Sequence, residues 1–137
     1  RCFHASVQEE IEAAVYRICQ GVAVSTRTEI KPEMERHYPP TINSAPESGI
    51  CLSVAEKLLG KAHVHHDMPP AMTAEDFSFM LLEKPGCYVW LGTGNKKARH
   101  SLHNPGYDFN DKATPIGVAY WVSLVHAILG GPENLPS

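Results

Sequence analysis

The chain has 137 residues, the length of one ordinary domain or of part of a larger one. Its 12 Lys and Arg residues and 15 Asp and Glu residues give a formal net charge of −3. This charge is too weakly acidic to indicate a nucleic acid or an anionic membrane surface as a partner. Hydrophobic residues make up 43% and charged residues 20%, which supports a folded core and excludes a disordered tail.

The first segment, residues 6–20, predicts a one-sided helix that ends at Gly21 and lies on a sheet. From residue 22 to residue 30 the pattern changes to alternation rich in β-branched residues, which predicts a strand with one exposed face. The run to Tyr38 continues this strand as an edge strand, and the two prolines that follow mark a domain boundary near residue 38.

Beyond this boundary, helical and strand patterns alternate. In chain order we expect a helix over 47–59, a short strand over 62–66, a helix over 74–83, a buried strand over 87–91, a long loop over 93–112 and a helix over 116–129. The alternation predicts an α/β fold. The last helix is apolar on all sides but shorter than the about 20 residues that cross a bilayer, so we expect a buried core helix and no membrane span.

The cysteines are widely spaced and form no C-x-x-C pair, so neither a disulfide scaffold nor a zinc ribbon is indicated. Reduced thiols in a cytoplasmic protein are the expectation. The chain begins at Arg1 without an initiator Met or a signal segment, which suggests a piece of a longer protein.

Three motifs follow one another between residues 72 and 111. They read Met72-Thr-Ala-Glu-Asp-Phe77, Pro85-Gly-Cys-Tyr-Val-Trp-Leu-Gly-Thr-Gly94 and Leu102-His-Asn-Pro-Gly-Tyr-Asp-Phe-Asn-Asp111. In this order and spacing they resemble the C-terminal part of the zinc-dependent amidohydrolases related to hippurate hydrolase, the N-acyl-amino-acid aminoacylases and the plant indole-acetyl-amino-acid hydrolases. The segment Tyr38-Pro-Pro-Thr-Ile-Asn43 resembles the return of that family from its lid domain to its catalytic domain.

The resemblance implies a two-domain metallopeptidase-like enzyme. Residues 1–37 would be the second half of a small α/β lid that mediates dimerisation, and residues 38–137 the C-terminal part of a zinc-peptidase-like α/β catalytic domain. The intact enzyme would hydrolyse the amide bond of N-acyl amino acids through water activated by two divalent metal ions, Zn or else Mn or Co. The general base and the other metal ligands would lie upstream, so we expect no catalytic residue in this chain and no activity of the isolated chain. We also expect a homo-oligomer.

His103 is the main candidate site residue. An imidazole on a loop after a buried strand is well placed to bind zinc, with its second ring nitrogen held by an acceptor such as Asp108, Asn110 or Asp111. The resemblance implies that His103 is the last metal ligand. Among the three possible acceptors, Asp108 is the one we expect to support it.

Two further groups have a functional and a structural interpretation. The resemblance places Glu75 and Asp76 near the active site as supporting residues, whereas carboxylates in the first turn of a helix also stabilise its dipole. Glycines in Gly92-Thr93-Gly94 would let backbone N–H groups approach a substrate carboxylate or acyl oxygen, although the same residues suit a plain turn.

Other histidines are weaker candidates. His63 and His65 would share one face of the predicted strand, but an exposed strand end explains them more simply. His100, beside Lys96, Lys97 and Arg99, suits a solvated basic loop tip. The alternative to an enzyme fragment is a non-catalytic oligomerisation or interaction module that pairs through the strand edge of residues 22–38.

Overall fold

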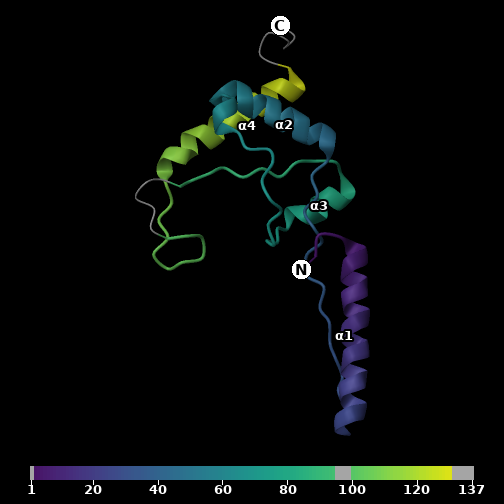
Figure 1. Cartoon of the computed structure of the whole chain (residues 1–137). Coiled ribbons are helices and arrows are strands. Elements are labelled where there is room, and N and C mark those ends of the chain that lie inside the picture. The colour runs from purple at the N-terminus through teal and green to yellow at the C-terminus, as the bar shows by residue number, and fades with distance from the viewer. Residues whose placement is uncertain (1, 95–99, 131–137) are drawn as a thin grey trace. The chain divides into compact units, whose positions relative to one another are not determined.

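The structure, a computed structural model, describes residues 2–94 and 100–130. Within these ranges the chain forms two compact units (Figure 1). Unit 1 comprises Arg1–Asn43 and Pro69–Gly86, and unit 2 comprises Ser44–Met68 and Cys87–Ser137. The predicted domain boundary near residue 38 stays a prediction.

Unit 1 begins with α1, Ala5–Thr26, the long purple helix of Figure 1. The predicted helix is therefore confirmed, but Gly21 does not end it, and the strand predicted from residue 22 is wrong over its first five positions. Arg27 ends the helix in the left-handed region, at φ 56°, and donates its backbone N–H to the carbonyl of Ala23.

Two hydroxyls in the last turn of α1 bond back to the helix itself. The hydroxyl of Thr26 donates to the carbonyl of Val22 at 2.7 Å, and the hydroxyl of Ser25 donates to the same oxygen at 3.0 Å. These bonds give both polar side chains a partner within the helix, so neither needs an extended backbone. The described residues from 27 to 43 contain no strand, so the predicted edge strand to Tyr38 is also absent there.

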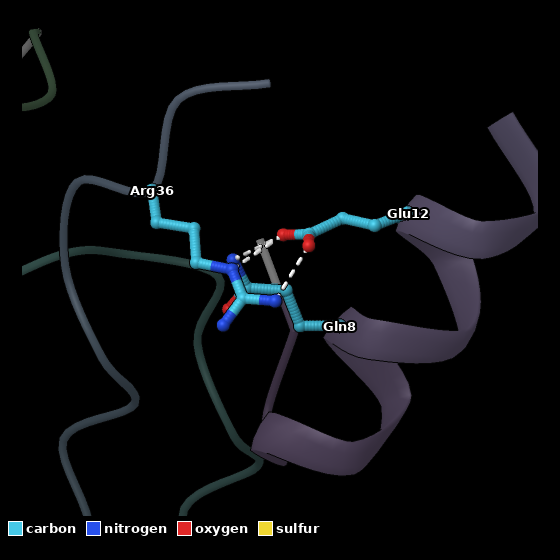
Figure 2. Close-up of polar contacts among 3 residues, drawn as sticks. All are labelled: Gln8, Glu12 and Arg36. Atoms are coloured by element: carbon cyan, nitrogen blue, oxygen red, sulfur yellow. Dashed lines mark hydrogen bonds and ion pairs between the residues drawn. The ribbon is translucent and has the colours of Figure 1, made fainter. Parts of the chain in front are cut away.

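An ion pair connects α1 to the irregular segment that follows it (Figure 2). The Arg36 guanidinium donates to both carboxylate oxygens of Glu12, at 2.7 Å and 2.5 Å, and the Gln8 amide donates to the same carboxylate at 3.1 Å. Arg36 lowers the pKa of the Glu12 carboxyl, and Glu12 raises the pKa of Arg36. A bidentate pair of this kind fixes the path of the returning chain.

The third helix, α3, Phe77–Glu83, completes unit 1. Ser78 is fully buried, and its hydroxyl donates to the carbonyl of Glu75 at 2.6 Å, where the helix begins. The ring of Phe79 packs against the ring of Tyr38 with centroids 5.8 Å apart. The predicted helix over 74–83 is confirmed from residue 77 onward.

Unit 2 contains the helices α2, Ala45–Leu59, and α4, Thr114–Leu129, with the short 3-10 helices η1, Lys61–His63, and η2, Asp111–Ala113. A proline lies in the first turn of α2 and of α4, where its missing N–H is not needed. The two helices pack against each other (Figure 1). Their contact holds a small core of Cys51, Val54 and Leu124, joined by the half-buried side chains of Cys87 and Tyr120.

The strands predicted at 62–66 and 87–91 are not present in the described chain, where all regular elements are helical. A helix satisfies its backbone within one segment, but a strand exists only with a partner that accepts and donates across the ladder. The apolar run at 87–91 forms no strand in the described residues and stays irregular. The α/β alternation expected from sequence is therefore not seen there.

The predicted helix over 116–129 is confirmed as α4, but the expectation that it is buried is wrong for the described residues. Leu124 is buried, whereas Val118, Trp121, Ile128 and Leu129 are exposed. By length and composition alone, Asp111–Leu129 is also apolar enough to cross a membrane, as core helices often are. α2 covers one side of α4, so an all-round apolar helix is left with exposed faces.

Candidate functional site

The segment that leads to Gly92-Thr93-Gly94 lies against both helices of unit 2. Cys87 packs on the core residues Cys51, Val54 and Leu124. Further along, the Leu91 side chain reaches α4 at Gly117, where an added Cβ would lie 3.3 Å from Leu91 Cδ2. The helices therefore anchor residues 87–91 and fix where the glycine-containing turn begins.

Thr93 is linked to the loop that carries His103. Its hydroxyl and the Tyr107 hydroxyl are 3.1 Å apart and share a hydrogen bond. Unit 2 thus connects two of the predicted site segments, although sequence reasoning gave Tyr107 no role. One feature of the sequence could have indicated this role: Tyr107 is a tyrosine in a loop otherwise rich in glycine, asparagine and aspartate. A tyrosine ring that packs on the protein usually gives its hydroxyl a hydrogen-bond partner.

The loop from residue 100 to residue 107, here called the histidine loop, is compact and built by local hydrogen bonds. The Asn104 N–H donates to the Ser101 carbonyl at 3.2 Å, and the Tyr107 N–H donates to the Asn104 carbonyl at 2.9 Å. The Asn104 side chain accepts from the Gly106 N–H at 2.9 Å. A Cβ at Gly106 would lie 2.8 Å from His100 Cδ2, so a larger residue there would have to displace the His100 ring.

His103 occupies the left-handed region of backbone space, with φ 67°, at the exposed tip of the histidine loop. A residue with a Cβ pays a steric penalty of about 1–2 kcal/mol in this region, which glycine avoids. Strained non-glycine residues of this kind cluster at functional sites. Arg27 has the same conformation at the end of α1, so a positive φ also suits a residue that ends a helix or forms a turn.

The described residues do not assemble a complete metal centre. No group of three or more His, Cys, Asp or Glu side chains among them has a geometry that could hold a metal ion. In the same ranges no hydrogen bond joins His103 to Asp108, and the Asn110 side chain accepts from the Lys112 N–H at 3.3 Å. Catalytic zinc needs three protein ligands, so His103 alone does not make a site.

The structure also places the weaker histidine candidates, His63 and His100. His63 closes the 3-10 helix η1, so the shared strand face proposed for His63 and His65 does not exist. The His100 ring lies beside Gly106, and among the described residues it belongs to no group of three side chains that could hold a metal ion. The basic residues Lys96, Lys97 and Arg99 lie outside the described residues.

Glu75 and Asp76 belong to unit 1, where their backbone carbonyls start α3. The Glu75 carbonyl accepts from both the hydroxyl and the N–H of Ser78, and the Asp76 carbonyl accepts from the Phe79 N–H at 3.0 Å. Asp76 is the residue that flanks the helix, so neither carboxylate lies inside its first turn. The sequence did not indicate Ser78, whose buried hydroxyl bonds to the Glu75 carbonyl where α3 begins.

A second polar cluster in unit 2 was also missed, because sequence showed only isolated cysteines. The Ser48 hydroxyl donates to Cys87 Sγ at 3.5 Å, and the Tyr120 hydroxyl donates to the Cys51 carbonyl at 3.5 Å. Burial raises the pKa of the Cys87 thiol, and it raises the pKa of the Tyr120 hydroxyl well above its usual range.

Comparison with known proteins identifies the family. Residues 4–127 match the family described as peptidase family M20/M25/M40. The hippurate hydrolase of Campylobacter jejuni is 32% identical over 113 residues, which are 82% of this chain and 29% of that protein. The N-acetyldiaminopimelate deacetylase of Enterococcus faecalis is 29% identical over 120 residues, which are 86% of this chain and 30% of that protein.

A probable hydrolase of Synechocystis is 26% identical over 131 residues, covering 88% of this chain and 32% of that protein. The chain thus spans about three tenths of the length of these relatives. No solved structure matches it. Because the family match covers most of the chain and agrees with the motifs around His103, the chain belongs to peptidase family M20/M25/M40.

Proposed function

We propose that this chain is the C-terminal part of a metal-dependent amidohydrolase that removes the acyl group from N-acyl amino acids. The observation that carries the proposal is the pair of relatives named hippurate hydrolase and N-acetyldiaminopimelate deacetylase. Hippurate and N-acetyldiaminopimelate share one chemical feature, an amide between a carboxylic acid and the amino group of an amino acid. Both carry a free carboxylate beside that amide.

Gly92, Thr93 and Gly94 would bind the carboxylate or the acyl oxygen of such a substrate. A Cβ at Gly92 or at Gly94 would meet no atom within 4 Å, so the backbone there borders open space. Backbone N–H groups in an open glycine-containing turn are good donors to an anionic oxygen. The hydrogen bond between Thr93 and Tyr107 would hold this turn at a fixed place beside the histidine loop.

His103 would provide one imidazole ligand to the metal, and Asp108 would orient its second ring nitrogen. The described residues do not fit a complete site, because they contain no group of three metal-binding side chains. The remaining ligands and the general base would therefore come from residues outside this chain. Glu75 and Asp76 would support the site, and zinc is the metal we propose, with Mn or Co as alternatives.

The proposal extends to the organisation of the whole enzyme. Residues 1–37 would belong to a lid domain that mediates dimerisation, and residues 38–137 to a zinc-peptidase-like catalytic domain. The enzyme would be a cytoplasmic homodimer with two metal ions in each site.

The test is an amidase assay on the protein expressed from its complete reading frame, with any residues that precede Arg1 included. We expect release of the free amino acid from hippurate and N-acetyl amino acids, loss of activity with a chelator and recovery with Zn, Mn or Co. His103→Ala should abolish the activity, whereas His100→Ala, a histidine of the same loop, should retain most of it. Full activity in His103→Ala would refute the assigned ligand.

The 137-residue chain by itself should show no turnover in the same assay, because its described residues hold no group of three metal-binding side chains to activate a water. Robust turnover by the purified chain with added metal would contradict the division of the site that we propose.

A second candidate function, an association module, has support from the exposed apolar side chains of α4, among them Trp121 and Ile128. Apolar patches larger than a few hundred Å² favour association between chains. Association through a strand edge at residues 22–38 is no longer proposed, because residues 22–26 are helical and residues 27–38 form no strand. Size-exclusion chromatography over a range of concentrations tests this function, and a monomer at every concentration would eliminate it.

A further inference from the structure

The polar cluster between α2, α4 and the segment after Gly86 contains two thiols from distant parts of the sequence. Cys51 lies on α2 and is 8% exposed, and half-buried Cys87 packs against the core cluster that Cys51 forms with Val54 and Leu124. Cys87 Sγ also accepts a hydrogen bond at 3.5 Å from the hydroxyl of Ser48, which lies one helical turn before Cys51 on α2. Because both belong to unit 2, this proximity is a property of one compact body.

The proposed hydrolase function uses neither thiol. We propose that Cys51 and Cys87 form a redox-active dithiol, a modification site that closes to an intramolecular disulfide when the chain meets a small disulfide such as oxidised glutathione. The bond would tie α2 to the segment that leads to Gly92-Thr93-Gly94. The inference does not depend on the hydrolase assignment, because it concerns only the thiols of the folded chain.

The disulfide would form in two steps, and the more exposed thiol reacts first. The Cys87 thiol, the more exposed of the pair, loses its proton and attacks one sulfur of the small disulfide, which releases one small thiolate and leaves a mixed disulfide on Cys87. Cys51 then loses its proton, attacks the Cys87 sulfur and expels the second small thiolate. The protein is oxidised by two electrons, and one small disulfide is reduced to two small thiols.

The groups around Cys87 control the first step. Burial disfavours the Cys87 thiolate most, and the Cys51 thiol and the Glu47 carboxylate add to this effect, whereas the Ser48 hydroxyl donates to the sulfur and stabilises the thiolate. One carboxylate oxygen of Glu47 is buried without a hydrogen-bond partner among the described residues. The Tyr120 hydroxyl on α4 also lies at this cluster, where it donates to the Cys51 carbonyl. The oxidation should therefore be slow at neutral pH and faster as the pH rises, because the thiolate is the attacking species.

The test treats the folded 137-residue chain with oxidised glutathione and maps disulfides by mass spectrometry under non-reducing conditions. We expect the loss of two hydrogen atoms, a Cys51–Cys87 cross-linked peptide and no retained glutathione on either residue. In urea the same treatment should give mixed pairings that include Cys2 and Cys19, which separates proximity in the fold from chance encounter. A native product without the Cys51–Cys87 bond, at neutral and alkaline pH, would overturn the proposal.

Variants distinguish a true pair from two independent thiols. Cys51→Ala should leave a stable glutathione adduct on Cys87, because the resolving thiol is gone, whereas Cys19→Ser should not change the Cys51–Cys87 product. Ser48→Ala should slow the reaction and Glu47→Gln should speed it, with the same final disulfide in both. Rates unchanged in both of these variants, or changed in the opposite directions, would contradict the role given to the cluster.

Discussion

The clearest quantitative prediction concerns Leu124 and Leu129, two leucines of the same helix with opposite environments. Leu124 is 8% exposed and lies in the core of unit 2 with Cys51 and Val54, whereas Leu129 is 77% exposed. Replacement by alanine removes three carbon atoms in each case. Each buried carbon contributes about 0.8 kcal/mol, so Leu124→Ala should lower the free energy of unfolding by about 2 kcal/mol, and by more if a cavity remains.

The matched control, Leu129→Ala, should change the free energy of unfolding by less than about 0.5 kcal/mol, as expected for an exposed position. Urea denaturation followed by circular dichroism measures both values. A loss of about 2 kcal/mol corresponds to an about thirtyfold shift of the unfolding equilibrium, well above the error of the method. Equal effects of the two substitutions would refute the assignment of the α2–α4 contact as the core of unit 2.

Three further predictions follow from other contacts. Arg36→Ala should increase hydrogen exchange over residues 30–43, whereas Lys31→Ala, which breaks only the exposed pair with Glu29, should not. Because Arg36 lowers the folded-state pKa of Glu12, the ion pair should stabilise unit 1 at neutral pH, and this protection should be lost as the pH falls through that pKa. Gly106→Ala should displace His100 and shift the NMR resonances of the histidine loop, and the additional change His100→Ala should reverse most of that shift. Oxidation to the Cys51–Cys87 disulfide should raise the free energy of unfolding by about 4 kcal/mol through loop-closure entropy, measurable by urea denaturation with and without reductant.

Helices were predictable from this sequence to within a few residues because their signals are local. Apolar periodicity, Gly60 after α2 and a proline at the start of α4 are all readable within one segment. Where the prediction was wrong, at residues 22–26, the hydroxyls of Ser25 and Thr26 both donate to the Val22 carbonyl within the helix, a local pairing that an alternation rule does not consider. The strands failed for another reason, since a strand requires a partner that the segment itself does not contain.

The candidate site was predictable in its residues but not in its geometry. Sequence indicated His103 and Gly92-Thr93-Gly94 separately, through loop chemistry and a family resemblance. The hydrogen bond between Thr93 and Tyr107 and the packing of Cys87 on the core around Cys51 depend on how the helices of unit 2 pack. These long-range contacts carry no periodic signal, so only the structure provides them.

The composition of α4 and its observed burial together indicate what the helix requires. A helix that is apolar on all sides is stable in water only when more than one side is covered, and here α2 covers one. The chain spans about three tenths of the length of its relatives, and on our proposal that it is part of a longer enzyme we expect further residues, or a second copy, to cover Trp121 and Ile128. Concentration distinguishes the two: if a second copy covers α4, Leu129→Ala should weaken association and destabilise the chain more at high concentration. If the cover comes from the same polypeptide, its effect in the 137-residue chain should stay small at every concentration.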